Sequence, residues 1–327
     1  MAIVVVGGAG YIGSHTARAL RRHGHEVVIF DNLSTGSRLL ADGFELIVGD
    51  IADEDKVSKV MRRADAVMHF AAHAYVGESV ENPRKYFQNN VKAGLTLLNT
   101  TLDAGVRNFV FSSTCAVYGA PPTIPIAENT PRQPVNPYGA TKLFFENALE
   151  AYARAYGLSY AALRYFNAAG ADESGEIGEL HDPETHLIPL ALAAASETGP
   201  ELQVFGIDHP TPDGTCIRDY VHVNDIAEAH VLALRHLMMG GQSVTLNLGT
   251  GEGFSVKQVL ACVHRVTGKE VRWRQAPRRD GDPPSLVADS SRAYQVLRWR
   301  PQRALEEIVS TAWDWIELGR ARWSRPS

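Results

Sequence analysis

The sequence predicts an α/β fold, with a doubly wound parallel sheet and a smaller mixed α/β lobe. Two features of the chain lead to this prediction. Up to about residue 165, short β-branched runs alternate with segments of helical spacing, and such alternation builds a parallel sheet through right-handed crossovers. Beyond that point glycine and proline become frequent and the alternation fades, as in 170–183 and 205–214.

Strands are expected where short apolar runs are bounded by polar residues or glycine. These runs are 3–6, 27–30, 44–48, 66–69, 109–111, 160–163 and 244–248. Helical spacing between most of them covers 11–23, 53–62, 81–104 and 139–156. We expect residues 1–165 to form the lobe with the parallel sheet, with a return of the chain at about 221–250, and residues 166–327 to form mainly the second lobe.

Composition excludes several classes of partner. The chain has 327 residues, of which 45% are hydrophobic and 21% charged, so it can bury a sizeable core. Its formal net charge is -5 and it has no long basic run, so nucleic acid is not an expected partner. The apolar stretch 2–6 lacks a basic flank and is far shorter than the roughly 20 residues of a membrane helix, so neither secretion nor a membrane is expected.

The three cysteines, Cys115, Cys216 and Cys262, are widely spaced and form no CxxC pair. This pattern predicts neither a disulfide framework nor a zinc site. We therefore expect a protein of the reducing cytoplasm without a metal ion.

A glycine turn follows the first strand. Gly7, Gly10 and Gly13 have GxxGxxG spacing between that strand and the first helix. A side chain at Gly7 or Gly10 would keep a pyrophosphate away from the backbone, and the following helix offers free N–H groups. Gly13 lets that helix pack closely on the sheet. Ordinary strand–helix turns also contain glycines, so this motif alone leaves both interpretations open.

Two acidic residues end the next two strands. Asp31 lies 18 residues after Gly13, where a carboxylate can accept hydrogen bonds from an adenosine ribose. A 2′-phosphate would face that carboxylate and no arginine follows before Arg38, so the sequence favours NAD over NADP. Asp50 ends the third strand, where it could accept from the adenine amino group or cap the helix that begins near Asp53.

A YxxxK spacing places Tyr138 and Lys142 about one turn apart on one helix face. An ammonium beside a phenol stabilises phenolate, so Lys142 is expected to lower the pKa of Tyr138 and make it a general base. Ser112, Ser113 and Thr114 follow the strand at 109–111, at the edge where α/β sheets bind ligands. Thr114 is therefore placed to hold a substrate hydroxyl, whereas Ser112 could simply cap the nearby backbone.

Together these features resemble the extended short-chain dehydrogenase/reductases, and seven further stretches are similar to the nucleotide-sugar epimerases among them. The stretches are Gly10–His15, Val76–Ser79, Val117–Gly119, Arg164–Asn167, Asp213–Thr215, Arg218–Val223 and Arg278–Asp282. The resemblance spans nearly the whole chain. It implies a Rossmann-type NAD-binding domain over 1–165 and a lobe over 166–327 that mainly binds a UDP-sugar. The implied reaction is epimerisation at C4 through a transient 4-keto sugar, chiefly of UDP-glucose and UDP-galactose.

The same resemblance assigns roles to residues. It makes Tyr138 the base, Lys142 a ligand of the nicotinamide ribose and Thr114 a ligand of the sugar. The residues expected to contact NAD are Gly7, Gly10, Tyr11, Ile12, Gly13, Asp31, Asn32, Asp50, Ile51, Phe70, Ala71, Asn89, Ser112, Tyr138, Lys142 and Tyr165. The residues expected to contact the UDP-sugar are Thr114, Asn167, His186, Arg218, Arg279, Asp282 and Leu286.

The resemblance does not determine which sugar the UDP carries. Leu286 lies where some relatives carry a bulky residue and others a small one that admits 2-acetamido sugars. His186 lies at the position of another residue that lines the sugar pocket in relatives. Cys115 and Cys216 stand in stretches that also resemble the 4-epimerases of UDP-arabinose and UDP-xylose. UDP-pentoses and UDP-N-acetylglucosamine are therefore alternative substrates.

Two other functions remain as alternatives. A nucleotide-sugar 4,6-dehydratase shares the Tyr–Lys pair, but it resembles proteins with an Asp-Glu pair where this chain has Cys115-Ala116. A regulator that only senses NAD would need neither Tyr138 nor Lys142. The segments 81–104 and 139–156 resemble the helices through which this family dimerises, so a homodimer is expected.

Overall fold

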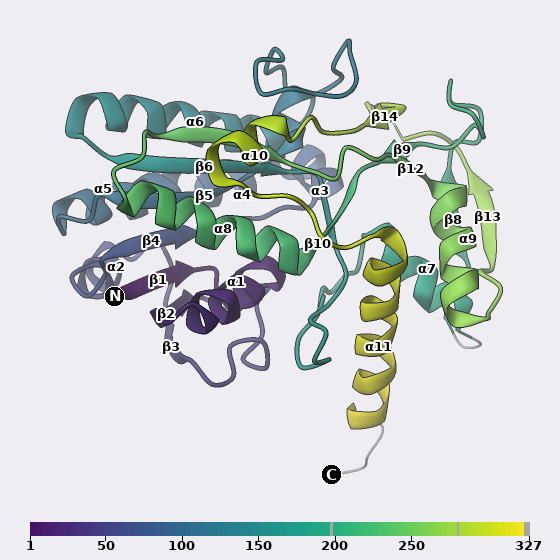
Figure 1. The fold of residues 1–327 in the computed structure, drawn as a ribbon, viewed down its shortest axis with the longest axis horizontal. Helices are drawn as coiled ribbons and strands as arrows, with labels where there is room; N and C mark the ends of the chain where they lie inside the picture. The colour runs from purple at the N-terminus through teal and green to yellow at the C-terminus, as the bar shows by residue number, and fades with distance from the viewer. Residues whose placement is uncertain (197–198, 280, 324–327) are drawn as a thin grey trace.

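A seven-stranded parallel sheet forms the larger lobe of the molecule (Figure 1). The structure is a computed structural model that describes residues 1–196, 199–279 and 281–323. The strands are β1 (Ala2–Val6), β2 (Glu26–Asp31), β3 (Glu45–Val48), β4 (Ala66–His69), β5 (Asn108–Thr114), β6 (Ser159–Tyr165) and β11 (Val244–Leu248). Their spatial order is β11-β6-β5-β4-β1-β2-β3. The predicted fold class and all seven predicted strands are confirmed.

Helices cover both faces of this sheet because its strands are apolar on both sides. On one face lie α1 (Tyr11–Arg22), α8 (Val223–Met238) and α10 (Ser291–Leu297), which share a core with Val5. On the other lie α2 (Glu54–Met61), α5 (Gly94–Asp103) and α6 (Pro137–Tyr156), which share a core with Val4. Within the described parts of the chain, no helix combines the length and apolar character needed to cross a membrane.

The helix predicted over 81–104 is wrong as a single element. The structure divides this region into α3 (Val76–Glu81), α4 (Pro83–Tyr86), a π-helical segment (Phe87–Ala93) and α5. Asn82 ends α3 and caps α4, because its side chain accepts from the Lys85 N–H and proline follows it at the first helical position. The π-helical segment that follows α4 contributes Asn89 to the candidate active site.

The described residues of the second lobe form three small sheets and three helices around a core of their own. Its helices are α7 (Leu187–Ala195), α9 (Val256–Thr267) and α11 (Leu305–Trp323). Its strands are β7 (Asn167–Ala169), β8 (Leu202–Phe205), β9 (Ile217–Arg218), β10 (Tyr220–His222), β12 (Phe254–Ser255), β13 (Trp273–Ala276) and β14 (Ser285–Leu286). The chain crosses between the lobes repeatedly, since α8, β11 and α10 all pack with the large sheet.

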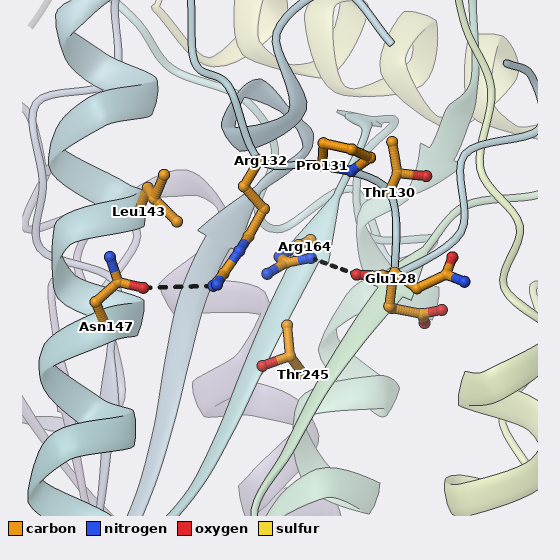
Figure 2. A pocket seen from close by; sticks show the side chains of 9 residues that line it. Glu128, Thr130, Pro131, Arg132, Leu143, Asn147, Arg164 and Thr245 are labelled. Atoms are coloured by element: carbon orange, nitrogen blue, oxygen red, sulfur yellow. Dashed lines mark hydrogen bonds between the residues drawn. The ribbon is translucent and has the colours of Figure 1, made fainter. Parts of the chain in front are cut away.

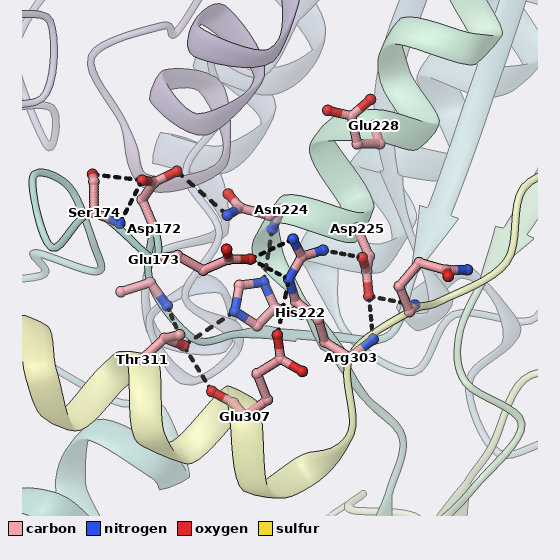
Figure 3. A network of polar contacts seen from close by, with 12 residues as sticks. Asp172, Glu173, Ser174, His222, Asn224, Asp225, Glu228, Arg303, Glu307 and Thr311 are labelled. Carbon is pink, nitrogen blue, oxygen red and sulfur yellow. Dashed lines mark hydrogen bonds and ion pairs between the residues drawn. The ribbon is translucent and has the colours of Figure 1, made fainter.

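A polar network joins the start of α11 to the large lobe (Figure 3). The guanidinium of Arg303 binds Asp225 at the start of α8, 2.5 Å away, and also contacts Glu173 and Glu307. Asp225 is only 2% exposed and also accepts from the backbone N–H groups of Gln302 and Arg303. This network fixes the segment that leads from α10 to α11 against α8.

Candidate active site

One pocket lies at the carboxyl edge of the large sheet. Its lining contains every residue predicted to contact NAD except Asp50. These residues come from the ends of β1, β2, β4, β5 and β6 and from the helices that follow them, because parallel strands present their carboxyl ends at one edge. Residues far apart in the sequence therefore meet in one cavity.

The glycine turn is required by the fold at two of its three positions. Gly7 has a φ of +78°, and a Cβ there would lie 2.4 Å from the backbone nitrogen of Ala71. A Cβ at Gly13 would lie 2.3 Å from the carbonyl oxygen of Gly7. At Gly10 the nearest atom would be 3.4 Å away, so a side chain would fit the fold but would enter the pocket. Gly10 therefore indicates a ligand close to the backbone, as a dinucleotide requires.

The acidic residues differ in their surroundings. Asp31 is 7% exposed and accepts hydrogen bonds from the N–H groups of Ala9 and Leu33. Burial raises the pKa of Asp31, and the two N–H groups oppose this. Asp50 accepts from Asn32 and from the Ala52 N–H, and it does not line the pocket. The alternative of Asp50 as a helix cap is wrong, since Asp53 caps α2.

The start of α6 fixes the Tyr–Lys pair. Asn136 caps this helix by accepting from the Gly139 N–H, and Pro137 occupies the first helical position. Lys142 is 3% exposed, and its ammonium donates to the carbonyl oxygen of Ser112 over 2.7 Å. The hydroxyl of Ser112 contacts that of Tyr165. Ser112 therefore ties Lys142 to both β5 and β6, and its hydroxyl contacts a side chain where the alternative expected it to cap nearby backbone.

The expectation that Lys142 lowers the pKa of Tyr138 is wrong in this structure. Burial raises the pKa of Tyr138 to about 12, and only a hydrogen bond with Thr114 opposes that rise. The ammonium of Lys142 lies 5.9 Å from the centre of the Tyr138 ring and is directed at Ser112. Burial also lowers the pKa of Lys142 to about 7, against the charge of Glu146. Desolvation thus outweighs the pairing of the two groups.

A buried ion pair lies behind Lys142. Glu146, one turn further along α6, binds Arg164 of β6 over 2.6 Å, and both side chains are 3% exposed. The hydroxyl of Ser113 donates to the same carboxylate. Because Ser113 lies between Ser112 and Thr114, this pair fixes the strand end that carries both predicted ligands. Sequence reasoning missed this pair, because Glu146 and Arg164 are 18 positions apart and meet only in the folded chain.

The π turn places Asn89 at the pocket and its neighbour Asn90 in a buried position beside it. Asn89 lines the cavity, as predicted. Its buried neighbour Asn90 accepts from the His73 N–H over 2.9 Å and donates to the Thr141 hydroxyl over 3.1 Å. Asn90 thus holds the loop after β4 against α6. Sequence reasoning missed Asn90. Its neighbour Asn89 lines the pocket while Asn90 contacts the loop after β4 and α6, and this arrangement of adjacent residues is found in the π turn.

The residues predicted to bind UDP gather in the second lobe. β14 pairs with β9, so that Leu286 lies beside Arg218. The guanidinium of Arg218 contacts the Asp282 carboxylate, and the Asn167 N–H donates to the carbonyl oxygen of Asp219 over 2.9 Å. The Arg279 guanidinium lies over the Phe205 ring, 3.9 Å from its centre.

The structure does not bring all the predicted substrate residues into the NAD pocket. His186 lines it, together with His181, which the sequence reasoning did not single out. Thr114 and the other five predicted residues lie outside its lining. Asp280, within one of the family stretches, lies outside the described residues.

A second cavity has no predicted site residue in its lining (Figure 2). Arg132 reaches across it to Asn147, and Arg164 donates to the Glu128 carbonyl oxygen. Both guanidinium groups of this cavity thus contact neighbouring residues of the chain.

A dinucleotide pocket that ends at a Tyr–Lys pair defines the class of protein. The chain belongs to the NAD dependent epimerase/dehydratase family, whose sequence profile matches residues 3–249. The resemblance to nucleotide-sugar epimerases and the expectation of NAD as cofactor are thereby confirmed.

Within that family, several of the proteins similar to this chain are UDP-glucose 4-epimerases. The enzyme of Rhizobium meliloti (strain 1021) is 50% identical over 315 residues, which is 96% of each chain. The crystal structure of the Brucella ovis enzyme with NAD has a TM-score of 0.93 at 49% identity and covers 95% of this chain and 97% of its own. The Stenotrophomonas maltophila enzyme, with NAD and formylated UDP-arabinopyranose bound, has a TM-score of 0.94 at 42% identity and covers 98% and 99%.

Proposed function

We propose that this chain catalyses NAD-dependent epimerisation at C4 of a UDP-sugar, with UDP-glucose and UDP-galactose as its substrates. One observation carries the proposal: a single pocket runs from the glycine turn and Asp31 to Tyr138 and Lys142. The first two suit the pyrophosphate and adenosine ribose of NAD, and the last two suit proton transfer beside the nicotinamide.

Different residues of the chain have different roles in the proposed reaction. NAD, when bound, supplies the hydride acceptor and donor. Tyr138 accepts the proton of the 4-hydroxyl and later returns one, while Thr114 positions that hydroxyl. Lys142 holds the nicotinamide ribose through its ammonium. The 4-keto sugar must turn over between the two proton transfers, so the UDP has to be held away from the reacting sugar.

The second lobe is proposed to hold the UDP. Arg218, Arg279, Asp282 and Asn167 lie there, apart from the Tyr138 end of the pocket. Guanidinium groups bind diphosphate oxygens through paired donors, and a carboxylate accepts from ribose hydroxyls. Firm contacts at UDP leave the sugar free to rotate.

A UDP-pentose is a second candidate substrate. The structural neighbour from Stenotrophomonas maltophila carries a formylated UDP-arabinopyranose, and it is 42% identical to this chain. Leu286 is half-buried and of intermediate size, which suits sugars with or without a C6 group. A 2-acetamido sugar remains the third candidate for the same pocket.

The test is incubation of the purified protein with UDP-galactose, UDP-N-acetylgalactosamine or UDP-xylose in separate reactions without added NAD. Chromatography then detects each 4-epimer. We expect UDP-galactose to give UDP-glucose, because the cofactor is regenerated in every cycle and stays bound. Conversion of UDP-xylose alone would favour the pentose proposal. Failure of all three, with NAD bound, would leave a dehydratase or a regulator.

We also propose a cytoplasmic homodimer with a Rossmann-type domain over 1–165 and a UDP-sugar lobe mainly over 166–327. Large apolar side chains are exposed on the segments named for the dimer, among them Phe87 and Phe144 (45% each) and Tyr156 (60%). Such a patch suits a subunit interface. Light scattering should give a dimer for the native chain and a monomer for the Phe87→Asp/Phe144→Asp variant, whereas a monomeric native chain rejects the interface.

A further inference from the structure

Four side chains of one loop in the second lobe converge beside the pocket. They are Glu179, His181, Glu184 and His186, and one candidate ligand atom from each lies within 4.8 Å of all the others. Zinc bound to imidazole nitrogen and carboxylate oxygen has bonds of about 2.0–2.2 Å, which places tetrahedral ligands about 3.3 Å apart. Small rotations of these side chains would therefore close them around one ion.

The pairwise distances agree with this geometry. Nδ1 of His181 lies 3.0 Å from Oε1 of Glu179 and 3.8 Å from Oε2 of Glu184. Nδ1 of His186 contacts the same oxygen of Glu179. Both imidazoles thus place Nδ1 beside the same carboxylate oxygen, where one cation could take the place of these contacts.

His181 gives an independent indication of a ligand. Its Nδ1 is buried, yet no atom of the described residues meets it with hydrogen-bond geometry, although Glu179 is within 3.0 Å. Nδ1 of His181 thus lies between the carboxylates of Glu179 and Glu184 without a well-aligned hydrogen bond to either. A buried ring nitrogen without such a bond is costly, and a cation bound between the carboxylates would satisfy it.

Surrounding contacts hold the four side chains in place. Oε1 of Glu184 accepts from the N–H groups of Thr185 and His186 over 2.6 and 2.7 Å, which leaves Oε2 for the cluster. The Trp315 indole donates to the Glu179 carbonyl oxygen over 2.9 Å. The edges of the Tyr11 and Tyr75 rings pack against His181. Outer contacts of this kind orient metal ligands.

We propose that Glu179, His181, Glu184 and His186 bind one divalent cation of the zinc type. Two imidazole and two carboxylate ligands favour Zn²⁺ or Co²⁺ over Mg²⁺, which prefers an all-oxygen octahedron. His181 and His186 both line the NAD pocket, so the ion would lie at its wall. The cysteine pattern could not indicate this site, because its ligands come from an E-x-H-x₂-E-x-H segment without cysteine.

The experiment uses the full chain without an affinity tag, with its NAD bound, after treatment with a chelator. Calorimetric titration at pH 8 measures binding of Zn²⁺, Co²⁺ and Mg²⁺, together with the protons that the imidazoles release on binding. We expect one Zn²⁺ per chain, visible Co²⁺ bands typical of tetrahedral coordination, and no binding of Mg²⁺. The assay needs no substrate, so its outcome is separate from that of the proposed epimerisation.

Substitutions test whether these four side chains are the ligands of the ion. His181→Ala and Glu184→Gln should each weaken Zn²⁺ binding by more than the roughly 10- to 100-fold that loss of an outer contact causes. His264→Ala is the matched control, because its imidazole also faces a carboxylate, that of Glu270, 3.6 Å away. NAD content and Tm show that each variant is folded. Absence of Zn²⁺ binding, unchanged binding in both loop variants, or loss in His264→Ala would overturn the proposal.

Discussion

The ammonium of Lys142 donates a hydrogen bond to the carbonyl oxygen of Ser112, 2.7 Å away. This bond joins the start of α6 to the end of β5, the two elements that carry Tyr138 and Thr114. Lys142 therefore positions the site in addition to its proposed contact with the nicotinamide ribose.

Substitution of Lys142 should affect both roles. We expect Lys142→Met to lower kcat and the fraction of protein with bound NAD, kcat by about 10- to 100-fold, because a hydrogen bond to a charged group contributes about 1.5–3 kcal/mol. Progress curves and the ultraviolet spectrum of the purified protein measure the two effects. The exposed Lys59 of α2 is the control, and Lys59→Met should change neither. Full activity of Lys142→Met would reject the role of the ammonium.

Thr114 is expected to affect the pH dependence of kcat/KM through its hydrogen bond with Tyr138. Burial raises the pKa of Tyr138, and the hydrogen bond with Thr114 lowers it. Loss of that bond in Thr114→Val should raise the pKa further, so the base form of Tyr138 appears only at higher pH. We expect the ascending limb of the kcat/KM–pH profile to move to higher pH in Thr114→Val and to return in Thr114→Ser. An unmoved limb would show that Thr114 does not act on Tyr138.

Glu146 is expected to be important for stability. Glu146→Gln leaves the buried guanidinium of Arg164 without its charged partner, and breaking such a pair costs about 3–5 kcal/mol. Urea unfolding measures this loss. Glu150→Gln, on the same helix, breaks the exposed pair with Arg154 and should cost no more than about 0.5 kcal/mol. Equal losses in the two variants would contradict the argument from burial.

Four buried histidines should make the protein sensitive to acid. Burial lowers the pKa values of His15 and His230 to about 4 and those of His69 and His222 to about 3. The unfolded chain, with a histidine pKa of about 6.5, binds more protons below that pH. Stability from these groups is therefore complete above pH 6.5 and is lost as pH falls toward 4.

Urea unfolding at several pH values tests this sensitivity. The free energy of unfolding should fall by several kcal/mol between pH 7 and pH 5. His230→Leu places an apolar side chain in the same enclosure. It should reduce the slope of the free energy of unfolding against pH by about 1.4 kcal/mol per pH unit, which corresponds to one proton. A slope unchanged by the substitution would mean that His230 titrates normally in the folded protein.

Arg218 is expected to act on UDP and not on NAD. Arg218→Ala should raise the Kd for UDP by about 10- to 100-fold, the effect of losing a charged hydrogen bond. The content of bound NAD should stay the same, because Arg218 does not line the NAD pocket. Calorimetry with UDP measures the change, and Arg265→Ala, which removes an exposed partner of Glu306, is the control. Unaltered UDP affinity would exclude Arg218 from the site.

The sequence by itself determined the parallel sheet and most of the NAD pocket. Each strand needs only a short apolar run, and glycine is needed at Gly7 and Gly13 for local reasons of backbone shape. Parallel strands then bring their carboxyl ends to one edge whatever their separation in the chain. Asp31, Ser112 and Tyr165 could therefore be placed together before any distance was known.

Tertiary structure alone decided the remaining features. The π turn at Asn89 and Asn90 depends on packing against α6, and no local pattern distinguishes it from an ordinary helix. The contact of Arg218 with Asp282 joins residues 64 positions apart. Burial raises the pKa of Tyr138, and the neighbouring Lys142 that the spacing revealed does not offset this rise. Burial and contacts between distant segments arise only when the whole chain is folded, and a linear motif does not contain them.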